Sequence, residues 1–211
     1  MITPELGKHP QWAAEYLEGL EWEARRRELA TLEQKLPGVQ RIFKQLISGL
    51  PSPNRSAHEF PVSAVVVRKG ADNKLEVVST TQNQVNAKGD STAHAEIEAL
   101  KEAEVKTGDK HLDGLFLLST MEPCVMCCAA AVHTEVEGVI YGASHTDVEG
   151  THALVGEEYK PWRISPDSFD ADAYLSESGL FVVGGLMKDD VLGAIKRTTG
   201  SWQRYYTDPD A

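Results

Sequence analysis

The chain has 211 residues, of which 41% are hydrophobic and 25% are charged, which is typical of a globular protein with one sizeable core. A disordered chain and a coiled coil are disfavoured. The formal net charge is −11 at pH 7, and such a surface repels phosphate backbones and anionic lipids, so nucleic acid and membranes are disfavoured as partners. Because no apolar run approaches the roughly 20 residues of a membrane span, and residues 1–10 lack a signal-peptide pattern, we expect a cytoplasmic location.

The first fifty residues are predicted to form helices. Apolar residues recur at helical spacing within residues 12–20 and again within residues 39–50, with Pro37-Gly38 separating the two stripes. We assign no chemistry to this segment. The sequence therefore predicts a helical N-terminal extension at residues 1–50, which packs or stabilises a dimer, followed by the main domain at residues 51–211.

The rest of the chain alternates between predicted strands and helices. The predicted strands are residues 62–67, 75–80, 115–119, 139–141 and 180–184, and the predicted helices are residues 92–105 and 124–134. Turn-forming residues join the first two strands into a hairpin. Alternation of this kind predicts a layered α/β domain. Residues 143–178 are too long for a bare connection, and we interpret them as an irregular flap over a site.

The three cysteines of the chain all lie between positions 124 and 128. They are too close together for a disulfide framework and suit a metal site in a reducing compartment. Cys124 and Cys127 are three positions apart, so their sulfurs would share one face at the start of a helix. His94 lies at the start of the preceding predicted helix, for which Ser91 or Thr92 is a candidate N-cap. One imidazole and two thiolates form a soft set of ligands that suits zinc.

Glu96 makes this metal site a candidate for catalysis. A carboxylate two residues from a ligand can lie beside a metal-bound water without binding the metal. Zinc with three protein ligands keeps a fourth position open and lowers the pKa of its bound water to about 7. Glu96 could take a proton from that water and return it to a leaving nitrogen, which indicates hydrolytic deamination of an amidine-like ring carbon.

Residues 92–97 and 122–127, together with Phe60-Pro61, resemble the cytidine deaminase superfamily, whose zinc signature is H-x-E with P-C-x-x-C. Within it they are most similar to the branch of guanine deaminases and tRNA adenosine deaminases. The resemblance covers roughly residues 60–142. It implies a three-layer α/β/α sandwich on a mixed, mostly five-stranded sheet, one Zn²⁺ per chain and commonly a homodimer.

The same resemblance implies roles for the motif residues. Zinc binding is implied for His94, Cys124 and Cys127. The catalytic role of proton shuttle is implied for Glu96. The alternative is a purely structural zinc site, in which Cys128, four residues after Cys124, would face the metal. A fourth protein ligand would replace the metal-bound water and leave Glu96 without a catalytic role.

Substrate contacts are inferred from the resemblance as well. Asn83 matches the asparagine that relatives use to hydrogen-bond the base, although asparagine also favours turns after strands. The backbone N–H groups of Ala95 and Cys124 would lie near the reacting centre. Glu157 or Glu158 in the flap is a candidate second carboxylate for the substrate, and exposed flap acids are the alternative interpretation.

The sequence departs from the pattern of its relatives just before Phe60-Pro61. Relatives tend to have a pair of small residues there, whereas this chain has His58-Glu59. The entrance of the substrate pocket is therefore expected to differ.

The combined prediction is a zinc-dependent aminohydrolase that releases ammonia from a small-molecule nucleobase, guanine or a related aminopurine or aminotriazine. Deamination of adenosine in tRNA would use the same residues. From His145 onward, however, the chain carries twelve acidic residues against six basic ones, and this charge would repel RNA. Cytosine deamination by the same chemistry stays open, as does a zinc-fold binding protein without turnover.

Overall fold

The computed structural model describes residues 29–50, 59–149 and 169–199. In these residues five strands form one sheet in the order β2-β1-β3-β4-β5. The strands are β1 (Ser63–Lys69), β2 (Leu75–Gln82), β3 (Leu115–Met121), β4 (Gly138–Ala143) and β5 (Phe181–Val183). Strand β1 pairs antiparallel with β2 and β3, whereas β3, β4 and β5 run parallel. The predicted mixed five-stranded sheet is confirmed.

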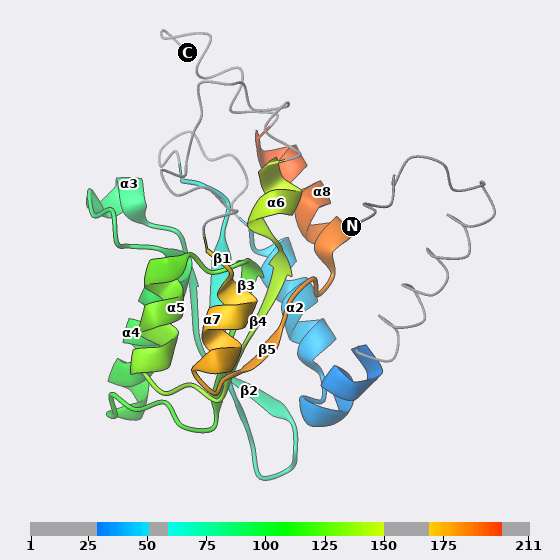
Figure 1. Cartoon of the computed structure of the whole chain (residues 1–211), viewed down its shortest axis with the longest axis vertical. Coiled ribbons are helices and arrows are strands. Elements are labelled where there is room, and N and C mark those ends of the chain that lie inside the picture. The colour runs from blue at the N-terminus through cyan, green and yellow to red at the C-terminus, as the bar shows by residue number, and fades with distance from the viewer. Residues whose placement is uncertain (1–28, 51–58, 150–168, 200–211) are drawn as a thin grey trace, which may run out of the picture.

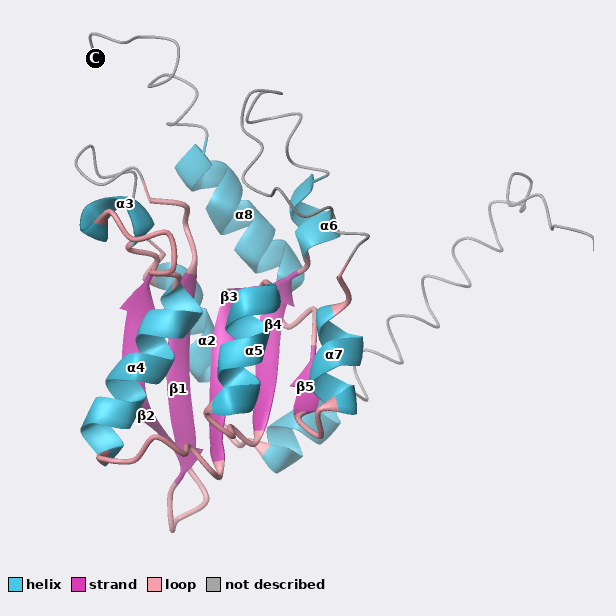
Figure 2. Cartoon of the chain, turned by 60° about the vertical axis from the view of Figure 1, so that its left-hand side comes forward, coloured by secondary structure: helices cyan, strands magenta, loops and turns pink. Residues whose placement is uncertain are grey.

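Helices cover both faces of this sheet (Figure 1). They are α2 (Val39–Ser48), α3 (Val85–Lys88), α4 (Ala95–Thr107), α5 (Val125–His133), α6 (His145–Glu149), α7 (Ala171–Glu177) and α8 (Lys188–Thr199). Figure 2 shows α4, α5 and α7 on one face and α2 and α8 on the other, which confirms the three-layer sandwich. Among the described residues, no helix combines the length and the apolar character needed to cross a membrane.

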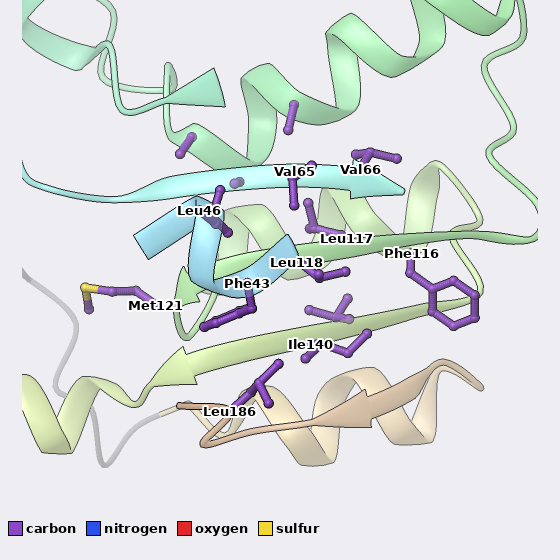
Figure 3. Close-up of a cluster of buried hydrophobic side chains, with 14 of the residues drawn as sticks. Phe43, Leu46, Val65, Val66, Phe116, Leu117, Leu118, Met121, Ile140 and Leu186 are labelled. Carbon is purple, nitrogen blue, oxygen red and sulfur yellow. The ribbon is translucent and has the colours of Figure 1, made fainter. Parts of the chain in front are cut away.

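The central strands are buried because helices cover both of their faces. All six residues of β4 are buried, as expected for a strand inside a covered parallel sheet. In Figure 3, Phe43 from α2 lies over the strands that carry Leu118 and Ile140, and all three side chains are fully buried. The core therefore lies on both sides of β1, β3 and β4.

Gly142 in β4 lies close to the helical layer. A Cβ atom at this position would lie 2.6 Å from the Thr120 carbonyl oxygen and 2.7 Å from Cγ2 of Val191 in α8. Such distances are shorter than real carbon contacts, so a larger residue would push the strand or α8 out of place. Glycine allows this close packing because it has no side chain.

The apolar stripe predicted within residues 39–50 forms α2. Its buried residues are Val39, Ile42, Phe43, Leu46 and Ile47, and the helix packs against β1 and β3. Residues 29–35 are also helical, whereas the stripe at residues 12–20 lies outside the described residues. The end of the predicted extension is thus part of the core, while the division of the chain at residue 50 stays a prediction.

The prediction for residues 143–178 is wrong where the structure describes them, because this segment contains α6 and α7. Asp170 caps α7 by accepting a hydrogen bond from the Ala173 backbone N–H at 2.9 Å, as aspartate often does at an N-cap. Helix α8 was also missed. Its buried Val191, Ala194 and Ile195 follow helical spacing, but Gly193 interrupts the apolar pattern.

Candidate metal centre and active site

The two sequence motifs meet where α4 and α5 begin. His94 is the N-cap residue of α4 (φ −67°, ψ 151°), and Cys124 is the N-cap residue of α5 (φ −69°, ψ 169°). An N-cap residue usually caps its own helix with a side-chain oxygen, but neither of these side chains does so. The imidazole and the thiol contact each other instead, so two helix starts converge on one point.

The candidate N-caps Ser91 and Thr92 are wrong, because His94 itself occupies the N-cap position. The hydroxyl and the backbone N–H of Thr92 both donate to Oδ1 of Asp90, at 2.7 and 2.8 Å. Thr92 therefore belongs to a local turn that leads the chain into α4.

Three ligand atoms form a regular triangle at this point. The Cys124 and Cys127 sulfurs are 3.6 Å apart, and each lies 3.6 Å from Nδ1 of His94. Tetrahedral zinc, with bonds of about 2.3 Å to sulfur and about 2.0 Å to nitrogen, separates its ligand atoms by about 3.5–3.8 Å. The donor set and its spacing fit zinc, so these three residues could hold one zinc ion.

The electrostatics of the triangle favour a thiolate. A hydrogen bond from the Cys127 thiol, supported by one from His94, lowers the pKa of Cys124 to about 4. The same contact with Cys124, together with burial, raises the pKa of Cys127. The contact with Cys124 also raises the pKa of His94. Metal binding needs deprotonated ligands, so the lowered pKa of Cys124 favours zinc binding, and the Cys127 thiol would release its proton when zinc binds.

Cys128, the alternative fourth ligand, is directed elsewhere. Its sulfur is fully buried and lies 3.4 Å from the Pro123 carbonyl oxygen, to which its thiol donates. Burial raises the pKa of this thiol. Within the described part of the chain, the group of mutually close metal-binding atoms contains His94, Cys124 and Cys127 without Cys128. Among the residues that the structure describes, no fourth side chain joins this triangle.

Glu96 lies beside this triangle in the first turn of α4. Its side chain is buried, and its Oε2 is 3.6 Å from the Cys127 sulfur. Oε1 accepts a hydrogen bond of 2.8 Å from the hydroxyl of Ser119. Burial raises the pKa of Glu96, although the Ser119 hydroxyl opposes this shift. A buried carboxyl group with a raised pKa next to a metal site is suited to proton transfer near neutral pH.

Sequence reasoning missed Ser119. It lies in β3, in the middle of the sheet, and is fully buried. The available signal was a hydroxyl residue in an otherwise apolar strand, five positions before Cys124. Only the fold shows that this hydroxyl meets Glu96, which is 23 residues away in the chain.

Asn83 follows β2 and lies next to the segment that leads into α4. Its backbone N–H donates to the Val62 carbonyl at 3.0 Å, and the N–H of Gln84 donates to the Ala93 carbonyl at 2.9 Å. The Asn83 side-chain amide donates to Oε2 of Glu59 at 2.8 Å. Thus the neighbour of Asn83, Gln84, is bonded to the residue that precedes His94.

The other predicted contacts divide between described and undescribed residues. Ala95 is the first residue of α4 and is buried, so its N–H belongs to the helix turn whose donors have no partner within the helix. The same applies to the start of α5, after Cys124. Glu157 and Glu158 lie outside the described residues.

The comparisons with known proteins agree with this geometry. Residues 44–143 match the family described as the cytidine and deoxycytidylate deaminase zinc-binding region. A tRNA-specific adenosine deaminase from Streptococcus pyogenes serotype M18 is 33% identical over 124 residues, which are 59% of this chain and 72% of that protein. The chain therefore belongs to the cytidine deaminase superfamily of zinc-binding deaminases.

Two further relatives are guanine deaminases. The one from Bacillus subtilis is 38% identical over 87 residues, covering 41% of this chain and 53% of that protein. The solved guanine deaminase from Nitrosomonas europaea superposes with a TM-score of 0.55 at 26% identity, covering 79% of this chain and 84% of that chain. The match spans only 17%, 53% and 57% of three other curated relatives.

Proposed function

We propose that this protein is a zinc-dependent aminohydrolase that deaminates a free nucleobase, guanine or a related aminopurine or aminotriazine. The observation that carries the proposal is the buried Glu96 carboxylate, whose Oε2 lies 3.6 Å from the sulfur of a zinc-ligand candidate, Cys127. The guanine deaminases from Bacillus subtilis and Nitrosomonas europaea support a purine as substrate.

The reaction needs an activated water and a proton carrier. His94, Cys124 and Cys127 would hold the zinc ion, which when bound would lower the pKa of a water to about 7. Glu96 accepts a proton from the attacking water and donates it to the amine that leaves the ring carbon. The Ser119 hydroxyl holds Oε1 of Glu96 at 2.8 Å, so the carboxylate keeps one orientation through both transfers. Asn83 hydrogen-bonds the ring.

Deamination of adenosine in tRNA is the second candidate. The Streptococcus pyogenes relative, of which this chain covers 72%, carries that activity in its name. Charge favours the free base, because the protein has a formal net charge of −11 and RNA binding depends on basic contacts to phosphates. Cytosine deamination, a homodimeric assembly and a cytoplasmic location also stay predictions.

The test is ammonia release by zinc-loaded protein. The panel contains guanine, adenine, cytosine, isocytosine, ammeline, their nucleosides and a tRNA anticodon stem-loop. We expect turnover of a free purine or triazine, with zinc-loaded Glu96→Gln as the inactive control. Activity on the stem-loop alone would favour the tRNA candidate over our proposal. No turnover on any member, with zinc retained, would favour a binding protein.

A further inference from the structure

Glu59 is a buried carboxylate that the mechanism above does not use. It is only 9% exposed, and a carboxylate is rarely so buried unless its oxygens have partners. Oε2 accepts a hydrogen bond of 2.8 Å from the side-chain amide of Asn83, and Oε1 accepts one of 2.7 Å from the backbone N–H of Ala87. Both oxygens therefore hold the same segment, which runs from the end of β2 into α3.

This contact fixes which way the Asn83 amide faces. An ionised carboxylate can only accept hydrogen bonds, whereas an asparagine amide has a donor side and an acceptor side. The NH₂ group of Asn83 must therefore face Glu59, and its Oδ1 atom points away from Glu59. Without a charged acceptor, the last torsion of asparagine has a broad, roughly two-fold preference. Glu59 removes that freedom.

The backbone of Asn83 is held independently of Glu59. Its N–H is bonded to Val62, and the next residue, Gln84, is bonded to Ala93, directly before His94. The distance between the Asn83 backbone and the metal centre is therefore set by main-chain bonds. Glu59 contributes only the orientation of the side chain, which separates its effect from that of the fold.

We propose that Glu59 is a positioning residue, which locks the amide of Asn83 in the single orientation that binds the ring. This inference rests on the proposed function, because that function assigns Asn83 to the substrate. In this orientation Asn83 offers the ring its Oδ1 acceptor and its second amide N–H.

The orientation can be observed without turnover by ¹⁵N–¹H NMR of the zinc-loaded protein. The side-chain NH₂ signals of Asn83 are assigned by their loss in Asn83→Ala. A proton donated to a carboxylate forms a stronger bond than one donated to a neutral acceptor, so Glu59→Gln should shift that proton upfield. The matched control is Glu76→Gln, which removes an exposed carboxylate paired with Arg68. Unchanged Asn83 signals in Glu59→Gln would overturn the proposal.

The kinetic test compares Glu59→Gln, Asn83→Ala and the double variant by kcat/KM for guanine. A glutamine at position 59 can accept only one of the two hydrogen bonds with its single oxygen, while its NH₂ group faces the other donor. We expect each single variant to lower kcat/KM about 10-fold, the scale of a lost charge-assisted hydrogen bond. The double variant should be no slower than Asn83→Ala, because Glu59 acts through Asn83.

Two kinetic outcomes would contradict the inference at equal zinc content. One is wild-type kcat/KM in Glu59→Gln, and the other is a double variant in which the two losses multiply to about 100-fold. If wild-type protein does not act on guanine, the same cycle is measured on the substrate that the panel identifies. If no substrate is found, the proposed function has failed, and the NMR experiment alone decides whether Glu59 orients Asn83.

Discussion

The metal half and the substrate half of the candidate site are built by different means. His94 and Cys124 are N-cap residues at the starts of α4 and α5, and Cys127 follows one turn later. Cys124 and Cys127 share one helix start, and the fold places His94, 30 residues before Cys124, at the same point. Asn83 instead follows a strand, and its side-chain amide donates a hydrogen bond to Glu59, 24 residues away in the chain. The ligands of the first half come from two short motifs at helix starts, whereas the orientation of Asn83 depends on a side-chain contact outside any motif.

This difference predicts two kinds of mutational response. Substitutions in the metal half should act in an all-or-none manner, because a three-ligand site has no spare ligand. Substitutions in the substrate half, and of residues that hydrogen-bond the neighbours of the metal ligands, should give graded losses of activity or stability. Each of these contacts contributes one hydrogen bond. The following experiments proceed from the largest expected effect to the smallest.

Cys127→Ala should abolish both zinc binding and turnover. Loss of a hydrogen-bond partner behind a metal ligand already weakens metal affinity about 10- to 100-fold, so loss of a ligand should exceed this. Zinc content after gel filtration measures the effect. The control is Cys128→Ala, because this neighbouring thiol is hydrogen-bonded to the Pro123 carbonyl and should keep one zinc per chain. Full zinc content in Cys127→Ala would contradict the assignment of the ligand triangle.

Glu96→Gln should keep zinc and lose turnover. The amide has nearly the same shape and can still accept the Ser119 hydroxyl, but it cannot carry a proton. Removal of a general acid/base costs about 10²- to 10⁴-fold, and this should appear in kcat. Steady-state ammonia release with zinc content measured in parallel provides the check. A kcat within 10-fold of wild type would exclude Glu96 as the proton carrier.

These two experiments concern the part of the site that the sequence predicts well. The spacing within each motif is local, and the three positions between Cys124 and Cys127 place both sulfurs on one helix face. The strands of the sheet were predicted for the same reason, since β-branched runs and buried apolar runs are local signals.

The partners of these residues could not be predicted in the same way. Ser119 meets Glu96 only because β3 lies beneath the start of α4, and Glu59 meets Asn83 only because the chain before β1 runs alongside the end of β2. Such pairs depend on sheet order and register, which a single sequence does not specify. Helix α8 was missed because its apolar positions are few and Gly193 interrupts them.

Ser119→Ala should lower kcat about 10-fold without loss of zinc. The change removes the hydroxyl that holds Oε1 of Glu96 at 2.8 Å, and a hydrogen bond to a charged group is worth about 1.5–3 kcal/mol. Ser79→Ala is a matched control, because Ser79 is also a buried strand serine and donates to the Ala99 carbonyl of the same helix at 2.7 Å. It should lower stability while kcat stays unchanged. Equal kcat values for the two variants would rule out an orienting role for Ser119.

Glu98→Gln should have the smallest effect, and this effect should be on stability. Glu98 links the two halves of the site. This residue of α4 accepts hydrogen bonds from Lys88 of α3 and from Lys101, the latter at 3.3 Å. The contact with Lys88 lowers the pKa of Glu98 from its ordinary value of 4.5. We expect the free energy of unfolding at pH 7 to fall by up to about 1 kcal/mol, since Lys88 is largely exposed and such pairs are screened by water.

The pH dependence of this effect follows from its sign. Because folding lowers the pKa of Glu98, its ionised form stabilises the protein above pH 4.5, and this contribution is lost as the pH falls below that value. Urea unfolding should therefore separate wild type from Glu98→Gln at pH 7, and the difference should shrink as the pH falls below 4.5. The control Glu76→Gln removes an exposed carboxylate on β2. A Glu98→Gln difference that persists unchanged at the lower pH would show that packing, rather than the ion pair with Lys88, joins α3 to α4.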